Sequence, residues 1–430
     1  MNTYSEMKDS KIEWIGQIPK HWEIKRMKYW VNFIKGIEPG SKNYTFDESK
    51  LRFIRVKDIN KKNNKKTYVD IDTTLKVNFY DILLCFDGSP GSFSKGFEGI
   101  YSSGLKKIEL NSKKLDYQYV FYSLYCNFIQ EIIKFYSRGT TIQHASSSIN
   151  YLNLILPNKQ EQDSIAYFLD KKTSKLDIVI KNKKKQVKLL KEYEKIVINQ
   201  AVTKGLNPNA EMKDSGIEWI GQISKDLILK RIKNVSFVKA RIGWQGLSSD
   251  EYKDEGYSLL VTGTDFYNNS IKWETCHYVD EERYTQDTYI QVQNNDVLIT
   301  KDGSIGKIAL VENFDKKATL NSGVFVVRPQ RNLFLPKYLF WILKSVLFTN
   351  FIEFIKTGST ISHLYQKTFE TFSFPLPNLE KQKKIIFYLD NTINLINKII
   401  NKTKEEIIKL EEYKKILIND CVTGKMKVIA

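Results

Sequence analysis

The stretch from Asn158 to Lys204, NKQEQDSIAYFLDKKTSKLDIVIKNKKKQVKLLKEYEKIVINQAVTK, contains neither glycine nor proline and decides the predicted architecture. Apolar residues recur through it at gaps of mostly 3, 4 or 7, which is typical of a helix that packs lengthwise against a partner. This seam consists of Ile165, Leu169, Leu176, Val179, Val187, Leu190 and Val197. Adding 220 to each number gives a second apolar set, Ile385, Leu389, Ile396, Ile399, Ile407, Leu410 and Leu417. We therefore expect two long helices with matching seams.

Length and charge restrict the class of protein. A chain of 430 residues is too long for one ordinary domain. Its net charge of +18 points to a polyanionic partner, nucleic acid before membrane, although a lysine-rich solvated surface is the alternative. The four cysteines are widely spaced, which favours a reducing cytoplasm over a zinc knuckle or disulfide framework. No apolar run approaches the length of a spanning helix, so we expect a soluble intracellular protein.

The chain contains an internal duplication. Met7–Ile18 returns as Met212–Ile223, and the two copies differ only at Lys11 and Gly216. Shorter matches follow in the same order, namely Asp81–Ser89 with Asp296–Ser304, Ser103–Gly104 with Ser322–Gly323, Gly139–His144 with Gly358–His363, and Leu156–Asn158 with Leu376–Asn378. The intervening segments, roughly 35–135 and 240–355, share little else. We call the repeated segments beside the long helices the joints, and the intervening segments the inserts. This pattern is expected if the joints bind one kind of partner and the inserts bind two targets. Drift of an old duplication is the alternative.

The two inserts combine strand-like and helix-like segments. Short apolar runs that end in polar turns predict the strands Leu51–Val56, Asp81–Phe86, Ile108–Leu110, Ser258–Val261, Asp296–Thr300 and Val324–Val327. Aromatic-rich segments predict helices over Tyr117–Phe135 and Lys337–Ile355. We therefore expect two mixed α/β domains, with a hinge at Asn207-Pro-Asn209.

Motifs for catalysis are missing. The sequence has no Gly-x-x-x-x-Gly-Lys-Ser/Thr phosphate loop and no Gly-x-Gly-x-x-Gly fingerprint. Asn207-Pro-Asn209 differs from the Asn-Pro-Pro-aromatic motif of amino-methylating enzymes. Four histidines offer little material for metal or acid–base work. We expect a protein without catalysis, cofactor or metal.

The remaining candidates are residues that recognise nucleic acid. Hydroxyl residues in the Asp-Gly-Ser and Gly-Thr/Ser-Thr turns stand near cations, as phosphate positioning requires. Arg241 and Gln245 can make bidentate contacts to base edges in a major groove. For any one residue, a solvated surface is the competing interpretation. The expected DNA-binding set is Lys35, Lys57, Ser89, Lys95, Arg138, Thr140, Thr141, His144, Lys239, Arg241, Trp244, Gln245, Ser304, Lys307, Lys356, Ser359, Thr360 and His363.

Taken in order and repeated twice, these motifs resemble the specificity subunit of type I restriction–modification enzymes over essentially the whole chain. The resemblance implies an α+β fold with two target-recognition domains, separated by two long helices that pack as an antiparallel coiled coil with pseudo-twofold symmetry. The corresponding boundaries are 1–157 and 207–377 for the domains, and 158–206 and 378–430 for the spacer helices.

The same resemblance implies that each domain reads one half of a split site in double-stranded DNA. It also implies docking to two methyltransferase subunits and recruitment of motor–nuclease restriction subunits, with no catalysis by this chain. The sequence departs from the pattern where Ser224-Lys-Asp-Leu227 replaces Pro19-Lys-His-Trp22, so the second opening turn is expected to be looser. Two other classes stay open: a coiled-coil adaptor that binds only proteins, and a nuclease, for which no motif exists.

Overall fold

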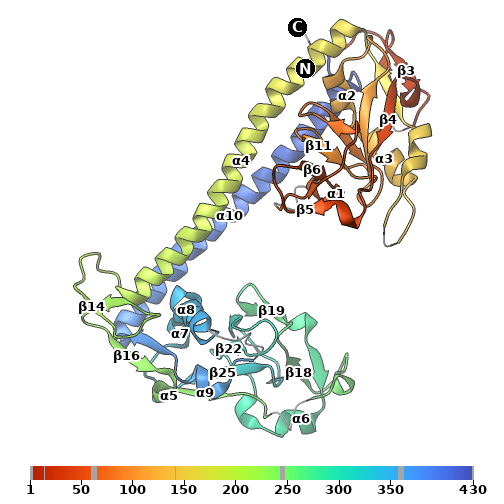
Figure 1. Cartoon of the computed structure of the whole chain (residues 1–430). Helices are drawn as coiled ribbons and strands as arrows, with labels where there is room; N and C mark the ends of the chain where they lie inside the picture. Colours follow the sequence, from red (N-terminus) through yellow and green to blue (C-terminus); the bar gives the residue numbers. More distant parts are fainter. Residues whose placement is uncertain are drawn as a thin grey trace. The chain divides into compact units, whose positions relative to one another are not determined.

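The computed structural model describes residues 3–13, 15–59, 65–140, 142–242, 247–356 and 363–428. The chain divides into two compact units, unit 1 (1–184 with 404–430) and unit 2 (185–403). Each unit combines a mixed α/β domain with part of both long helices, α4 (Lys159–Thr203) and α10 (Leu379–Val422) (Figure 1). The described chain therefore has the α+β repeat that the sequence predicts.

Unit 1 is built on two sheets, and the buried core strand of the first sheet, β9 (Ile82–Cys85), packs in two hydrophobic clusters. The four-stranded sheet has the order β10 (Phe93–Ser94), β9, β12 (Leu105–Leu110), β4 (Val31–Lys35). The second sheet has the order β5 (Tyr44–Thr45), β7 (Tyr68–Val69), β6 (Leu51–Ile54), β11 (Gly99–Tyr101), β8 (Lys76–Val77). All four residues of β9 are buried, and they alternate between two hydrophobic clusters, because a strand presents successive side chains to opposite faces.

Unit 2 repeats this plan. Its four-stranded sheet has the order β17 (Ser236–Lys239), β25 (Val324–Pro329), β22 (Val297–Thr300), β23 (Ile308–Leu310), and its three-stranded sheet the order β21 (His277–Val279), β18 (Ser258–Val261), β24 (Ala318–Leu320). A two-stranded pair, β19 (Phe266–Tyr267) with β20 (Ser270–Ile271), stands beside them. The core strand β22 is fully buried and serves two clusters, as β9 does in unit 1.

Both predicted helices of the inserts are broken. Residues 117–135 form α2 (Tyr117–Ser123) and α3 (Asn127–Phe135), and residues 337–355 form α7 (Pro336–Lys344) and α8 (Val346–Ile355). The second break falls at Ser345, whose hydroxyl accepts a hydrogen bond from the Leu347 amide and so caps α8. In the described part of the chain, no single helix is long and apolar enough to span a membrane; α7 and α8 pass this test only as a pair bent by 61°. The short helices are α1 (Val56–Ile59), α5 (Ile232–Val235), α6 (Glu281–Thr285) and α9 (Gln366–Phe369).

The duplicated joint has the same structure in both units. The repeated opening motif forms a hairpin, β1 (Met7–Asp9) with β2 (Gln17–Pro19) in unit 1 and β14 (Met212–Asp214) with β15 (Gln222–Ser224) in unit 2. The next strand then pairs with the strand that precedes the long helix, β3 (Glu23–Arg26) with β13 (Asn153–Leu156) and β16 (Ile228–Arg231) with β26 (Ser373–Leu376). Each insert therefore begins and ends beside a long helix.

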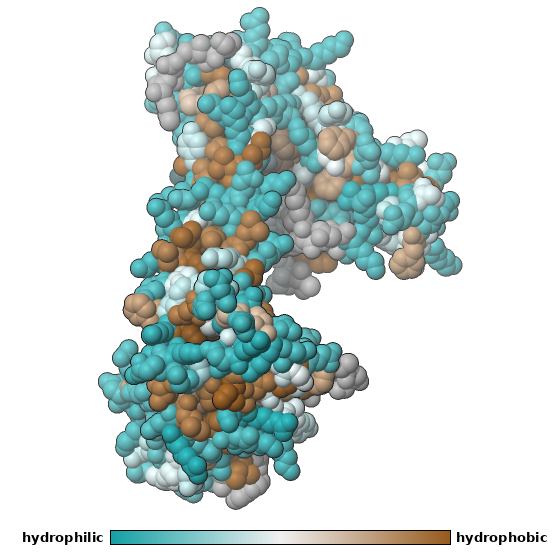
Figure 2. Space-filling model, turned by 90° about the vertical axis from the view of Figure 1, so that its left-hand side faces the viewer, coloured by the Kyte–Doolittle hydropathy of each residue, from teal (hydrophilic) through white to brown (hydrophobic). Residues whose placement is uncertain are grey.

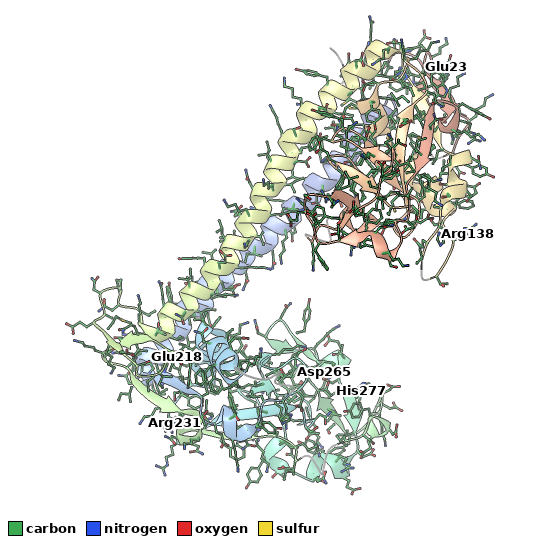
Figure 3. The ribbon with its side chains drawn as sticks, viewed as in Figure 1. Glu23, Arg138, Glu218, Arg231, Asp265 and His277 are labelled. Carbon is green, nitrogen blue, oxygen red and sulfur yellow. The ribbon has the colours of Figure 1, made fainter. Side chains whose placement is uncertain are left out.

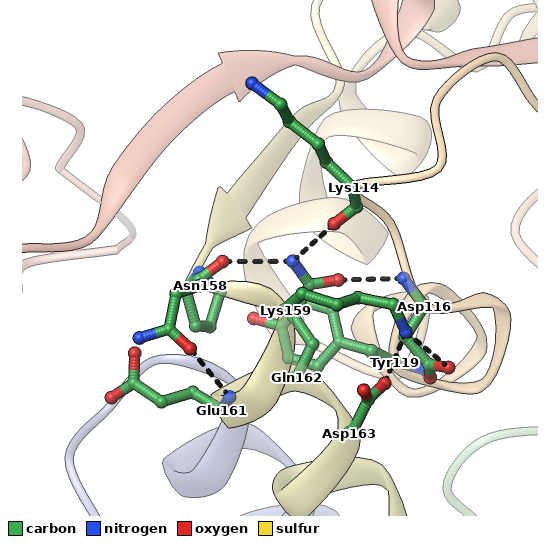
Figure 4. A network of polar contacts seen from close by, with 9 residues as sticks. Lys114, Asp116, Tyr119, Asn158, Lys159, Glu161, Gln162 and Asp163 are labelled. Carbon is green, nitrogen blue, oxygen red and sulfur yellow. Dashed lines mark hydrogen bonds and ion pairs between the residues drawn. The ribbon is translucent and has the colours of Figure 1, made fainter.

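A buried glutamine attaches each long helix to its domain. The Gln162 amide accepts a hydrogen bond from the Asp116 amide (2.9 Å) and donates to the Lys114 and Pro157 carbonyls (Figure 4). Gln382 makes the equivalent three contacts, with Leu335, Leu333 and Pro377. The preceding asparagines cap the helices: Asn158 accepts from the Glu161 amide, and Asn378 from the Lys381 amide. The Pro-Asn-x-x-x-Gln motif is thus a helix cap followed by an anchor.

The second opening turn keeps polar contacts despite its different sequence. In unit 1, His21 and the Trp22 indole both bond Glu161 on α4. In unit 2, Asp226 forms an ion pair with Lys381 and accepts a hydrogen bond from the Ser224 hydroxyl, so the carboxylate lies on the turn instead of on the long helix. Leu227 is buried, and a hollow of about 390 Å³ lies beside it. The replacement changes the packing next to the turn.

The long helices pair antiparallel within each unit. In unit 1 the start of α4 (Ile165, Leu169) shares a cluster with the end of α10 (Leu417, Ile418). In unit 2 the end of α4 and the start of α10 share another. Ion pairs join the helices in unit 1, between Lys183 and Glu406, Lys184 and Glu411, and Lys414 and Asp177.

The predicted seam is wrong at one position in each helix. Val179 and Ile399 are 42% and 39% exposed, whereas their neighbours Ile180 and Ile400 are 7% and 3% exposed. The reason is the heptad rhythm: buried positions alternate by four and three residues, so the step after Leu176 is four and reaches Ile180.

Candidate nucleic-acid interface

The Asp-Gly-Ser turn and the Gly-x-Thr-Ile-x-His segment of unit 1 come together at one edge of the domain. Asp87 follows the core strand β9, and its carboxylate lies 2.8 Å from Nδ1 of His144. Backbone hydrogen bonds join the same two segments: the Gly88 amide donates to the Gln143 carbonyl, and the Ala145 amide donates to the Phe86 carbonyl. Two segments that are 57 residues apart therefore form one loop site.

The Ser103–Gly104 match belongs to this loop site as well. The amides of Phe86 and Asp87 both donate to the Gly104 carbonyl. A β-carbon on Gly104 would lie 3.1 Å from a Val56 methyl and 3.3 Å from the Asp87 carbonyl, so the approach leaves little room for a side chain. All three short matches of the insert thus occupy one place in the fold.

Unit 2 builds an equivalent loop site. The Asp302 carboxylate pairs with Nδ1 of His363, the Lys301 amide donates to the Gly323 carbonyl, and the Leu364 amide donates to the Lys301 carbonyl. In both units the histidine uses Nδ1 for the aspartate, which fixes the ring and leaves Nε2 for another partner. In both units, therefore, an aspartate at an Asp-Gly turn bonds a histidine that is distant in the sequence.

A shallow groove of about 650 Å³ lies next to the loop site of unit 1. Three of the predicted DNA-binding residues, Lys57, Ser89 and His144, line it. His144 has a side chain that is 63% exposed, and Lys57 is exposed on α1. The groove can therefore present a cation, a hydroxyl and an imidazole to a ligand.

Four other predicted residues of unit 1 lie outside the described lining of the groove. Arg138 is exposed where the chain leaves α3 and donates to the Phe135 and Ser137 carbonyls (Figure 3). Thr140 is exposed on the same loop, and Lys35 is exposed at the end of β4. Lys95 lies elsewhere: its ammonium bonds Gln118 and covers the Phe121 ring on α2, and burial lowers its pKa. Lys95 thus packs against α2 and does not line the groove in the described residues.

The predicted residues of unit 2 are also dispersed. Ser304 and Lys307 are exposed, and the Lys307 ammonium donates to the Gly263 carbonyl. Lys239 is half-buried, 3.7 Å from Asp287 and above the Tyr289 ring. Lys356 is exposed at the end of α8, where it pairs with Glu353. The other candidates, Thr141, Trp244, Gln245, Ser359 and Thr360, lie outside the described residues.

Arg241 is not available to a base edge. Its side chain is 1% exposed, and its guanidinium donates to the Leu320 and Arg283 carbonyls and to the side chains of Gln286 and Thr319. Burial lowers the pKa of Arg241, because a charged group is disfavoured away from water. The expected base contact by Arg241 is therefore replaced by a structural role, in which the arginine ties a loop to β24.

Sequence reasoning missed Arg55, which lines the groove beside Lys57. In the described residues Arg55 Nε has no hydrogen-bond partner, and Oδ2 of Asp58 lies 3.9 Å from it. Its position immediately after the strand Leu51–Ile54, one residue from α1, could have identified it, since residues that follow a core strand often point into a site. A second missed cation, Lys106, covers the Phe86 ring, and burial lowers its pKa.

The described architecture defines a class of protein: a duplicated two-domain chain with paired long helices and one loop site in each domain. The family model "Type I restriction modification DNA specificity domain" matches it twice, over residues 19–189 and 230–409. Because these matches cover more than half of the chain, it belongs to the family of type I restriction–modification specificity subunits.

Curated relatives cover nearly the whole chain. The type I restriction enzyme MjaVIII specificity subunit of Methanocaldococcus jannaschii is 27% identical over 435 residues, which cover 96% of this chain and 94% of that protein. The EcoBI specificity subunit of Escherichia coli is 21% identical, covering 99% and 90%.

Solved structures share the fold. A chain from a structure described as "Structural basis underlying complex assembly and conformational transition of the type I R-M system" gives a TM-score of 0.71 at 15% identity, covering 95% of this chain and 99% of that one. The HsdS subunit from Thermoanaerobacter tengcongensis gives 0.51 at 15% identity, covering 95% and 98%.

Proposed function

We propose that the chain recognises a bipartite, asymmetric site in double-stranded DNA, with domain 1–157 reading one half and domain 207–377 the other. The observation that carries this proposal is that both domains build the same His–Asp loop site and then surround it with different side chains. A common frame with different linings is what two related readers of different sequences need.

One turn illustrates the difference in lining. Asp58 accepts a hydrogen bond from the Arg55 amide, and Asp265 accepts one from the Thr262 amide, each at 2.8 Å. These equivalent turns carry Arg55 and Lys57 in unit 1 but Thr262 and Thr264 in unit 2. Arginine and lysine favour guanine acceptors or phosphate, whereas threonine hydroxyls accept or donate to several bases. We infer that the two half-sites differ in sequence for this reason.

The long helices set the distance between the half-sites in this proposal. Segments 158–206 and 378–430 act as the spacer, and α4 alone has 45 residues at about 1.5 Å each. One heptad can be inserted into α4 between Lys175 and Lys191 and another at the matching place in α10. Such an insertion preserves the seam. It should lengthen the spacer between the half-sites and leave both half-site sequences unchanged.

Exposed apolar residues on the helices provide docking positions for two methyltransferase subunits. Unit 1 exposes Tyr167 on α4 with Tyr413 and Ile416 on α10, and unit 2 exposes the matching residues Phe387 on α10 with Tyr193 and Ile196 on α4. Residues three apart on a helix share a face, so each pair forms a small patch. Brown apolar patches interrupt the hydrophilic surface over the long helices in Figure 2. Two matching patches suit two copies of one partner, and motor–nuclease subunits would join this assembly.

Mapping of methylated adenines across the genome, with and without this gene, tests the function. The proposal expects one split motif that disappears when the gene is removed. A gel shift with the methyltransferase present separates DNA recognition from a protein-only adaptor, because phosphate contacts make affinity fall steeply with salt. Unchanged methylation together with salt-independent or absent DNA binding would reject the proposal in favour of the adaptor.

A further inference from the structure

A basic and aromatic hollow of about 760 Å³ adjoins the loop site of unit 1. Its described lining includes the aromatic residues Tyr44, Phe46 and Tyr68 and one carboxylate, Glu48. It also includes four cations, Arg55, Lys57, Lys65 and Lys66. Four positive charges against one negative charge favour an anionic ligand, and the aromatic rings add flat apolar surface.

Phe46 is the most unusual residue of this hollow. It is 92% exposed, although burial of a phenylalanine side chain ordinarily stabilises a fold. The turn that follows is fixed, because the Asp47 amide donates to the Thr45 hydroxyl and the Ser49 amide to the Asp47 carboxylate. The Lys65 ammonium lies 6.0 Å from the centre of the Phe46 ring. The domain therefore presents an aromatic ring to solvent from a held turn, beside a cation.

This hollow continues into the groove at the loop site. Tyr44, Arg55 and Lys57 line both of them. A ligand that contacts His144 and Ser89 in the groove can thus reach Phe46 without leaving the basic surface. Aromatic side chains among cations are the combination that stacks on nucleobases while the cations hold the neighbouring phosphates.

We propose that Phe46 stacks on a base of the half-site bound by unit 1 and separates that base from its neighbour, while Arg55, Lys57, Lys65 and Lys66 hold the adjacent phosphates. The inference rests on the proposed function and deepens it. It makes unit 1 a reader that deforms its half-site as well as contacting it.

Fluorescence of 2-aminopurine tests this inference directly, because the base brightens when it loses its stacking neighbours. The full chain, assembled with its methyltransferase subunits, is bound to duplexes that carry the mapped target with 2-aminopurine at successive positions of either half. The wild-type chain should brighten one position in or beside the half-site of unit 1. Phe46→Ala should remove this signal and weaken binding by about 5- to 150-fold, which corresponds to one stacked base. Phe46→Trp should keep the signal.

Phe79→Ala is the matched control. Phe79 is 55% exposed in the same unit and lies outside the described lining of both hollows. Its loss should leave fluorescence and affinity unchanged, and thermal melting should show that both variants remain folded. If Phe46→Ala keeps the signal and the affinity while the two half-sites are still discriminated, the stacking inference is overturned and the proposed function stands. If the wild-type complex fails to distinguish the mapped site from a scrambled duplex, both are overturned.

Discussion

The joints of the two units have stayed alike, whereas their inserts have diverged. At the joints, Gln162 and Gln382 make the same three hydrogen bonds, and the buried Tyr119 and Tyr338 hydroxyls donate to equivalent strand carbonyls, those of Ile155 and Pro375. In the inserts, Arg55 and Lys57 line an open groove in unit 1, whereas the equivalent turn of unit 2 carries Thr262 and Thr264. Contacts from a side chain to backbone atoms tolerate sequence change around them, so the frame persists while the exposed lining varies.

The largest expected loss of stability comes from the aspartate that precedes the core strand of unit 2, and it distinguishes this strand, β22, from β9 of unit 1. Asp296 immediately precedes β22, is buried, and makes a two-point ion pair with Arg328, at 2.6 and 2.7 Å. Burial raises its pKa and the Arg328 contact lowers it, with burial the larger cause. Asp296→Ala leaves the Arg328 guanidinium without its carboxylate partner, with only the Tyr289 and Gln291 carbonyls as acceptors, and should destabilise unit 2 by about 3 to 5 kcal/mol in denaturant unfolding.

Asp81 is the matched control for that change. It precedes β9 in unit 1 and makes the same turn contact, accepting from the Asn78 amide as Asp296 accepts from the Gln293 amide. Asp81→Ala should cost about 1 kcal/mol, the value of one such hydrogen bond. Equal losses for the two variants would show that the ion pair in unit 2 contributes nothing of its own.

The buried Arg241 of unit 2 and the groove-lining Arg55 of unit 1 provide the next contrast, between stability and DNA binding. Arg241→Met removes four hydrogen bonds from a buried site and should destabilise unit 2 by about 3 kcal/mol, because several acceptors lose their partner. Arg55→Met should leave stability nearly unchanged but weaken DNA binding about tenfold, as expected for a lost charged contact to DNA. Thermal melting and DNA titration of both variants give the comparison. A stable Arg241→Met chain with reduced DNA affinity would reverse these assignments.

The smallest effect concerns the anchors. Gln162→Ala and Gln382→Ala each leave buried backbone groups unpaired and should cost about 1 to 2 kcal/mol in their own unit. Gln160 is exposed on the same turn of α4, so Gln160→Ala should change stability little. Similar losses for the two anchor variants would support an equivalent joint, whereas a loss in only one unit would limit the anchor to that unit.

Sequence reasoning recovered features that repeat and missed those that depend on orientation. The duplicated motifs predicted two similar domains and two long helices, because repeats and heptads are visible in one chain. They also named the Asp-Gly and His segments, but not that Asp87 and His144 meet, since contacts between distant segments leave no local pattern. Arg241 and Arg55 have the same side chain, and the sequence around them does not show which one is buried; that depends on the fold. The one-residue error at Val179 has the same origin, because two neighbouring apolar residues compete for one seam position.

In the proposed function, the two equivalent loop sites read two different half-sites. Methylated adenines can be mapped in cells that carry either His144→Ala or His363→Ala as the only copy of the chain. We predict that His144→Ala relaxes one half of the split motif and His363→Ala the other, each with an unchanged spacer, because each histidine belongs to a separate domain. If both variants relaxed the same half, or if neither changed the motif, the proposal would be contradicted.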